Sequence, residues 1–430
     1  MTLWTKITNY APTGSLTRNI GWMFLGQGIG YSTRVIYFIL IARLLGVLQY
    51  GIVVGAYALV NMVAEYSKLG TGLVFLRYVS ADRSEFAVYW GNILLVTVSM
   101  SCLLIALLRL IAPHVIDPAS AAIVVLMAIA ACFFEQLTVS STQVFQAFEK
   151  MRIAAMLNLS TSLMRALTAG GMLLWLHRAT ARQWAIAFAA TSAVPTIIAV
   201  ILVTVHFGWP RFAPRLFSKR GTEGLEFAFA SSTTSAYNDL DKAMMSHYGM
   251  SAANGIYTMA YRVVDMATMP IASVQLASEP RLFQLGSAGV KEAVTLGSRL
   301  LKRTLLLSAS TAVGMFVLAP LIPFMVGRSF AESVIALRWL CLIPVFRSVH
   351  GIAGSVLTCI GCQRYRTLTQ IIAAVMNFGL NLWLIPKYGW HGAAWGSLAT
   401  DGALGAMNWS VLEWVRNRPS RYSMRMHPTE

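Results

Sequence analysis

The sequence predicts an all-α polytopic membrane protein of about twelve transmembrane helices, on three observations. First, 57% of the 430 residues are apolar and only 12% are charged, whereas soluble proteins carry roughly 25% charged residues. Second, long apolar runs recur between short polar breaks, and a helix needs about 20 such residues to cross a bilayer. Third, an internal repeat indicates two halves of six helices. This composition excludes an ordinary soluble enzyme.

The first predicted helix, residues 19–42, follows a short segment that contains Lys6 and Arg18. Its apolar run is too long for a signal peptide and lacks a small-residue cleavage site, so we expect it to be retained. The later runs do not show the ten-residue alternation of a membrane barrel. We therefore expect helices at residues 19–42, 48–69, 91–112, 119–147, 153–176, 184–207, 225–248, 251–278, 304–327, 333–361, 366–386 and 391–415.

The charges of the predicted loops indicate the orientation of the chain. The formal net charge is +17, and most Lys and Arg side chains outside the spans fall on the side that holds the N-terminus. Because cytoplasmic loops carry the excess of basic residues, we expect both termini in the cytoplasm. The cations are scattered over short loops, which favours anionic membrane lipids as their partner and disfavours nucleic acid.

Two long polar breaks organise the predicted chain. Residues 208–224 contain two prolines and four cations, and we expect a basic cytoplasmic linker there. It would separate an N-terminal six-helix lobe, residues 1–207, from a C-terminal lobe, residues 225–415, with a basic cytoplasmic tail at 416–430. The second break, residues 279–303, is basic and amphipathic. It is either a helix lying on an anionic leaflet or a plain connector.

The internal repeat rests on three matches that occur in the same order in both halves. These matches pair Gly51–Val60 with Gly255–Val264, Lys150-Met151-Arg152 with Arg364-Tyr365-Arg366, and Leu174-Trp175-Leu176 with Leu382-Trp383-Leu384. Both halves begin on the same side, so a pseudo-twofold axis along the membrane normal is expected. Such repeats are typical of transporters. Small residues at Gly26, Gly28 and Gly30, and at Gly392, Ala393, Ala394 and Gly396, should let helices approach closely.

The chain also resembles the Wzx-type polysaccharide flippases of the multidrug/oligosaccharidyl-lipid/polysaccharide (MOP) exporter superfamily. The motifs that carry the resemblance are Arg18–Gly28, Ala42–Gly51, Lys68–Gly72 with Arg77-Tyr78-Val79, Asp241-Lys242, Tyr248-Gly249 and Gly255-Ile256-Tyr257. The resemblance implies two lobes around a central cavity that opens alternately to cytoplasm and periplasm. It also implies a bacterial inner-membrane location, an undecaprenyl-pyrophosphate-linked oligosaccharide as cargo, and polysaccharide polymerase and export machinery as partners.

Charged side chains inside the predicted spans are candidate functional residues, because burying a charge in a bilayer costs roughly 2.5 kcal/mol or more. Three pairs of opposite charge are spaced i,i+3 and can neutralise each other on one helix face. These pairs are Glu65/Lys68, Asp239/Lys242 and Arg262/Asp265. The remaining charges, Arg34, Arg165, Arg347, Glu135, Asp241 and Asp401, have no near partner in sequence and can pair between helices or face a wet cavity.

Among these residues we expect Arg34 and Arg347 to bind a pyrophosphate, because a guanidinium donates two parallel hydrogen bonds to phosphate oxygens. Lys242 and Arg262 are further cavity candidates. Tyr57 and Tyr261 can stack on sugars, although ordinary helix packing also explains them. Asp239, Asp241 and Asp265 are candidates for proton or sodium coupling.

Alternative functions are a cation-coupled drug or small-molecule antiporter of the same superfamily and a membrane enzyme. The antiporter should have an acidic, aromatic cavity, whereas the spans here contain as many cations as acids. An enzyme needs positioned acid and base residues, and the predicted periplasmic loops are short. Cys359 and Cys362 lack a second ligand pair for zinc, so packing explains them better. We expect no catalytic residues, no metal and no cofactor.

Overall fold

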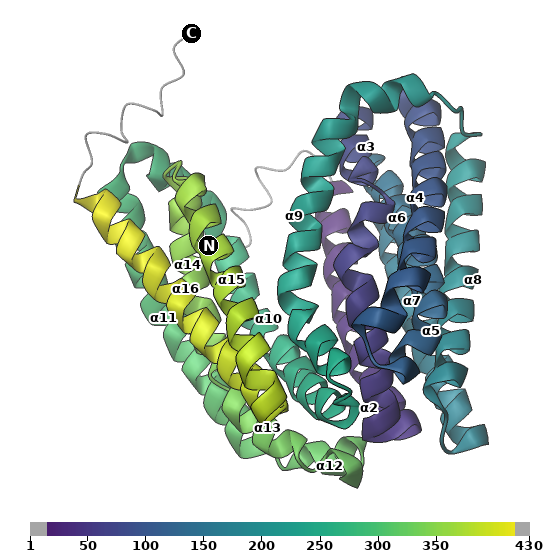
Figure 1. The fold of residues 1–430 in the computed structure, drawn as a ribbon. Helices are drawn as coiled ribbons and strands as arrows, with labels where there is room; N and C mark the ends of the chain where they lie inside the picture. The colour runs from purple at the N-terminus through teal and green to yellow at the C-terminus, as the bar shows by residue number, and fades with distance from the viewer. Residues whose placement is uncertain (1–14, 418–430) are drawn as a thin grey trace. The chain divides into compact units, whose positions relative to one another are not determined.

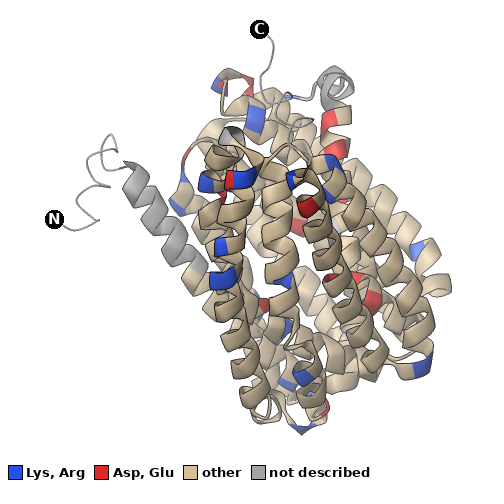
Figure 2. Ribbon diagram, turned by 90° about the vertical axis from the view of Figure 1, so that its left-hand side faces the viewer, with Lys and Arg blue, Asp and Glu red and all other residues tan. Residues whose placement is uncertain are grey.

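The computed structural model describes residues 15–417, with side chains left out for 15–27, 214–220, 230, 234, 287 and 288. Every regular element in this range is helical. Figure 2 shows long stretches of uncharged helix, with Lys, Arg, Asp and Glu concentrated toward the helix ends. The predicted basic tail lies almost wholly outside the described residues.

The chain divides into two compact units, Met1–Ser251 and Ala252–Glu430. In the first unit, α9 packs along α2, as Figure 1 shows. The elements of this unit are α2 (Ser15–Ala64), the 3-10 turn η1 (Glu65–Ser67), α3 (Thr71–Val79), the 3-10 turn η2 (Arg83–Glu85), α4 (Phe86–Val115), α5 (Pro118–Ala128), the π-helix η3 (Ile129–Phe134), α6 (Glu135–Ala147), α7 (Met151–Leu176), α8 (Ala181–Phe207) and α9 (Pro214–His247).

The second unit is a separate helical bundle in which α15 packs along α16 and α14 contacts both α11 and α16. Its apolar core includes Leu282, Ile352, Val356 and Leu412. The elements are α10 (Ser251–Ala288), α11 (Val290–Leu318), α12 (Leu321–Val326), the 3-10 turn η4 (Arg328–Phe330), α13 (Ser333–Leu340), α14 (Ile343–Cys359), α15 (Gln363–Tyr388) and α16 (Trp390–Arg416).

All twelve predicted spans are helical, and seven described segments are long and apolar enough to cross a membrane. The predicted breaks are shorter than expected. Only 208–213 of the linker is non-helical, and α9 packs in the first unit, so the division of the chain into six-helix halves stays a prediction. The segment 279–303 is neither a separate surface helix nor a plain connector, because it extends α10 and α11.

The first two spans are joined by a kink at Gly46 within α2. Gly46 has φ 66° and ψ 173°, a backbone conformation that is essentially restricted to glycine. The residues that follow α7 pack against this kink. The Ala179 N–H donates to the Leu44 carbonyl over 3.0 Å, and the Ala181 N–H donates to Gln49 Oε1 over 2.8 Å. The kink is therefore a fixed part of the first unit.

Small residues let helices approach closely in the second unit, as expected there. A Cβ on Gly392 would lie 2.4 Å from the Leu384 carbonyl oxygen, and one on Gly396 would lie 2.6 Å from Asn381 Oδ1. Asn381 also donates to Asn377 over 2.9 Å, and Asn377 donates to Thr400 over 3.3 Å. At Gly28 and Gly30, by contrast, an added Cβ would meet no heavy atom of the described residues within 4 Å. The prediction for Gly26 falls outside the residues whose surroundings are described.

We expect Gly46→Ala to destabilise the protein by about 1–3 kcal/mol, because alanine cannot adopt the kink without strain. The measurement is thermal unfolding of the purified protein in detergent. Gly171→Ala is the matched control, since Gly171 lies within α7 and an added Cβ there meets nothing within 4 Å. Equal melting temperatures for the two variants would contradict the assigned role of Gly46.

Candidate functional site

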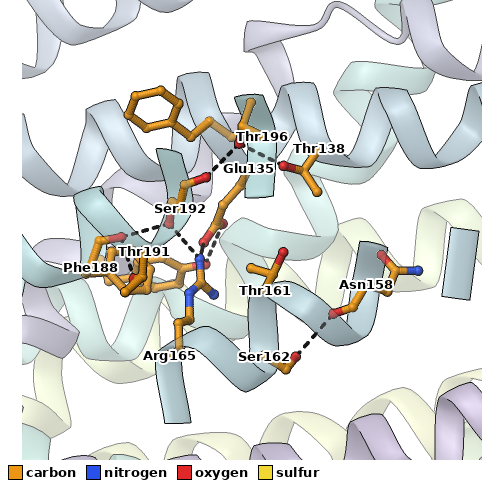
Figure 3. Close-up of polar contacts among 12 residues, drawn as sticks. Glu135, Thr138, Asn158, Thr161, Ser162, Arg165, Phe188, Thr191, Ser192 and Thr196 are labelled. Atoms are coloured by element: carbon orange, nitrogen blue, oxygen red, sulfur yellow. Dashed lines mark hydrogen bonds and ion pairs between the residues drawn. The ribbon is translucent and has the colours of Figure 1, made fainter. Parts of the chain in front are cut away.

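A buried polar cluster joins four helices of the first unit. Arg165 on α7 forms an ion pair with Glu135 on α6 and donates to Ser192 Oγ on α8 over 2.9 Å (Figure 3). Tyr57 on α2 donates to the second carboxylate oxygen of Glu135 over 3.4 Å. The Arg165 guanidinium also lies 4.3 Å from the ring centroid of Phe188. The cluster thus neutralises a cation and a carboxylate within the unit.

The π-helix Ile129–Phe134 ends directly before Glu135. A π-helix changes the backbone hydrogen-bonding pattern, and polar side chains from neighbouring helices bond to its carbonyls here. Ser101 Oγ donates to the Cys132 carbonyl over 2.7 Å, and Thr196 Oγ1 donates to the Phe134 carbonyl over 2.9 Å. Thr196 also shares a hydrogen bond with Thr138, as Figure 3 shows. These contacts fix the start of α6 and with it the position of Glu135.

A second charged group of the first unit lies on α9. Lys242 Nζ donates to Asp239 Oδ1 over 2.7 Å, and Asn61 on α2 donates to Asp239 Oδ2 over 2.7 Å. Asp241 is buried, and its Oδ1 accepts the Lys242 backbone N–H over 2.8 Å.

A further ion pair of the first unit lies just after α2, where Glu65 and Lys68 pair over 3.1 Å. The sequence-based i,i+3 pairings of Asp239/Lys242 and Glu65/Lys68 are therefore confirmed.

The main charged group of the second unit is centred on Arg347 of α14. Its Nη1 donates to Asp265 Oδ1 over 3.0 Å, and its Nη2 donates to the Tyr261 hydroxyl over 3.1 Å. Both partners lie on α10. The i,i+3 spacing suggested Arg262 as the partner of Asp265, but the ion pair of Asp265 is formed with Arg347 instead.

Further polar side chains of the second unit bond to α14 and pack against Tyr261. His350 lies one helical turn along α14, with its Nε2 3.9 Å from Asp401 Oδ1 on α16. Asn408 donates to the His350 carbonyl over 3.3 Å. Tyr257 is fully buried, shares a hydrogen bond with Ser397 and packs its ring 5.4 Å from that of Tyr261. These neighbours hold Tyr261 and α14 in place beside the guanidinium.

Solvent exposure distinguishes the ion pairs that lie on predicted spans. The side chains of Arg347 and Asp265 are 28% and 39% exposed, whereas those of Arg165 and Glu135 are 17% and 20% exposed. Lys242 and Asp239 are still more buried, at 8% and 13%. Arg347 is therefore the more exposed of the two arginines that form these ion pairs.

The other predicted residues occupy different surroundings. Arg34 is exposed on α2, with its guanidinium 5.7 Å from the ring centroid of Tyr31. Arg262 is partly buried on α10. The site roles of all these residues stay predictions. Sequence reasoning missed Ser192, Asn61 and His350, because neutral hydroxyl, amide and imidazole side chains on apolar helices give no charge signal.

Comparisons with solved structures identify the fold. An inward-facing multidrug resistance MATE family transporter of the MOP superfamily matches with a TM-score of 0.71 at 13% identity, covering 89% of this chain and 95% of that one. The lipid II flippase MurJ in an inward closed conformation matches with a TM-score of 0.68 at 12% identity, covering 94% and 90%.

A third match is a MOP superfamily transporter from Pyrococcus furiosus described as having a binding pocket of reverse polarity. Its TM-score is 0.59 at 12% identity, with coverage of 97% and 98%. A comparison with curated protein sequences gives no significant match. The fold is thus the two-lobe, twelve-helix fold of MOP transporters.

A sequence model described as "Polysaccharide biosynthesis protein" matches residues 16–285, which is more than half of the chain. The protein belongs to this polysaccharide biosynthesis family. It is a multi-pass membrane protein with the fold of MOP transporters. The resemblance to flippases of this superfamily is thereby confirmed.

We expect Arg165→Gln to destabilise the protein far more than Arg347→Gln. Removing one partner of a buried ion pair costs about 3–5 kcal/mol, because the other charge is left without compensation. The Arg347 pair is more exposed, so the charge left behind is less deeply buried. The measurement is the melting temperature of both variants in detergent. A larger loss for Arg347→Gln would contradict the structural role assigned to the Arg165 cluster.

Proposed function

We propose that the protein is a flippase for undecaprenyl-pyrophosphate-linked oligosaccharide repeat units, which it moves from the cytoplasmic to the periplasmic leaflet by alternating access. Family membership supports a role in surface polysaccharide biosynthesis. MurJ, which shares the fold, is described as a lipid II flippase. The protein would work in the bacterial inner membrane with both termini in the cytoplasm, alongside polysaccharide polymerase and export machinery. No covalent chemistry is needed for this transport.

The observation that carries the proposal is the accessible guanidinium of Arg347. A pyrophosphate is the charged part of the proposed cargo, and arginine is well suited to bind phosphate oxygens in pairs. Arg347 is partly exposed, and Tyr261 orients its Nη2 nitrogen from α10. The Tyr261 ring itself is buried against Tyr257, so its part in this site is to hold the guanidinium in place. The geometry therefore favours an anionic ligand at this position.

The competing function is a cation-coupled drug or small-molecule antiporter, because solved MATE transporters share the fold. An organic cation would be repelled by Arg347 but attracted by Asp265. The two functions thus assign opposite roles to the two members of one ion pair. Asp239, Asp241 and Asp265 remain candidates for ion coupling under either function.

We expect Arg347→Gln to weaken the binding of undecaprenyl pyrophosphate by about ten- to hundredfold, since charge-assisted hydrogen bonds contribute about 1.5–3 kcal/mol. Arg347→Lys should recover part of the affinity, because lysine keeps the charge but not the paired donors. The measurement is equilibrium binding of the purified protein in nanodiscs.

Arg338→Gln serves as the control for this experiment, because Arg338 is an exposed arginine of the same unit that lies 5.0 Å from the Phe316 ring centroid. Undecaprenol, which has no phosphate, should bind all variants equally. The antiporter would be favoured by two results together. Arg347→Gln would bind undecaprenyl pyrophosphate as the wild type does, and it would export a cationic dye as fast as the wild type does.

A separate cationic face on α11 fits the anionic lipids of the cytoplasmic leaflet. Arg299, Lys302 and Arg303 are exposed, while Gly297 faces the core, where an added Cβ would lie 2.6 Å from Val356. One turn further, Leu306 is 74% exposed. The helix surface therefore changes from basic to apolar between residues 303 and 306, as expected where a helix enters the hydrocarbon layer.

We expect phosphatidylglycerol to raise the melting temperature of the wild-type protein more than phosphatidylcholine does. Replacing Arg299, Lys302 and Arg303 by Gln should remove most of this difference, because each cation near an anionic surface contributes about 1 kcal/mol. The control is the double substitution of Arg178 and Arg182 by Gln, since these exposed arginines lie on the predicted periplasmic side. A full phosphatidylglycerol effect in the triple variant would contradict this lipid contact.

A further inference from the structure

The Arg347 group contains a carboxylate that a phosphate-binding site does not require. Asp265 Oδ1 accepts a hydrogen bond from Arg347 Nη1 over 3.0 Å. A carboxylate and a phosphate oxygen seek the same N–H donors, and both are negatively charged. A phosphate that approaches Arg347 therefore meets a pair that is already neutral, together with the repulsion of the nearby carboxylate. Asp265 must weaken binding as long as it stays in place.

Asp265 also has a favourable effect when no ligand is bound. An uncompensated arginine on a membrane-spanning helix is costly, and such residues usually pair with one another or with polar groups. Asp265 supplies that compensation from α10, while Tyr261 accepts the hydrogen bond of the second nitrogen. The hydroxyl of Tyr261 carries no charge, so it does not repel a phosphate.

The first unit offers a contrasting case. By the repeat, Tyr57 corresponds to Tyr261, and it too contacts an arginine–carboxylate cluster. There the guanidinium is bonded to Glu135 and Ser192 and lies on the ring of Phe188. That cluster is closed around its cation. The Arg347 pair is more exposed and contacts fewer groups, which are the properties needed for one anion to replace another.

We propose that Asp265 is an intramolecular stand-in for the cargo phosphate, so that binding and release proceed by exchange of anions on Arg347. This inference rests on the proposed function. As the pyrophosphate approaches, its oxygens replace the Asp265 carboxylate at Nη1, while Tyr261 keeps the guanidinium oriented. When the carboxylate returns, it displaces the phosphate. Exchange keeps Arg347 paired at every stage and limits the affinity, so that the cargo can leave.

The test compares the affinity for undecaprenyl pyrophosphate of wild-type protein and of Asp265→Asn, Asp265→Glu and Arg347→Gln variants in nanodiscs. Removing the competing charge should make Asp265→Asn bind about three- to tenfold more tightly, with a slower dissociation rate. Asp265→Glu keeps the charge and should bind much as the wild type does. Glu413→Gln is the matched control, because Glu413 forms an exposed ion pair with Arg416 in the same unit.

The outcomes separate this inference from the function on which it rests. Weaker binding by Arg347→Gln with tighter binding by Asp265→Asn supports anion exchange. If Arg347→Gln weakens binding but Asp265→Asn does not tighten it, the exchange is refuted and the phosphate site stands. If Arg347→Gln has no effect, the site and the exchange are both refuted. Should Asp265→Asn fail to fold, Asp265→Ser, which also removes the charge, is measured with the same expected direction.

Discussion

The bilayer interior contains almost no water that could hydrogen-bond to a polar group, and the architecture of this protein depends on that constraint. Each spanning segment must satisfy its own backbone, which requires helices. At two places where a helix departs from regular geometry, a neighbouring segment bonds to its carbonyls. Thr196 bonds the carbonyl of Phe134 at the π-helix, and the Ala179 N–H bonds the carbonyl of Leu44 beside the Gly46 kink. The same rule applies to charges, and the predicted spans contain ion pairs both along one helix, as in Asp239 with Lys242, and between neighbouring helices, as in Arg347 with Asp265.

Each unit contains an arginine–carboxylate pair with a tyrosine beside it. Tyr57 and Tyr261 match in the repeat, and each contacts an arginine–carboxylate pair. The direction of the tyrosine hydrogen bond differs, because Tyr57 donates to a carboxylate whereas Tyr261 accepts from a guanidinium. The supporting contacts differ as well, since Ser192 and Phe188 enclose Arg165. A repeated structural position has thus become a closed, stabilising cluster in one unit and a more accessible pair in the other.

Hydropathy predicts the helices well, because twenty successive apolar residues have few alternatives in a bilayer. Ion pairs on one helix are also predictable, as Asp239 and Lys242 show, because the spacing i,i+3 places both on one face. The pairing of Arg347 with Asp265 is not predictable in this way. These residues are 82 positions apart, and their contact depends on how α10 and α14 pack. The π-helix cannot be predicted from hydropathy either, because the extra residue in its turn leaves the apolar composition of the segment unchanged.

The presence of a charge in a membrane helix is therefore a weaker indication of function than its accessibility. Arg165 and Arg347 look alike in the sequence, since each is a lone arginine in an apolar run. Their surroundings give them different properties. Deeper burial with several partners makes a charge pair more expensive to open, and such a pair stabilises one structure. Partial exposure lowers the cost of opening, so a ligand of the right charge can compete for the arginine. A protein that must also release its ligand benefits from this second arrangement, because the arginine is paired both before and after the ligand binds.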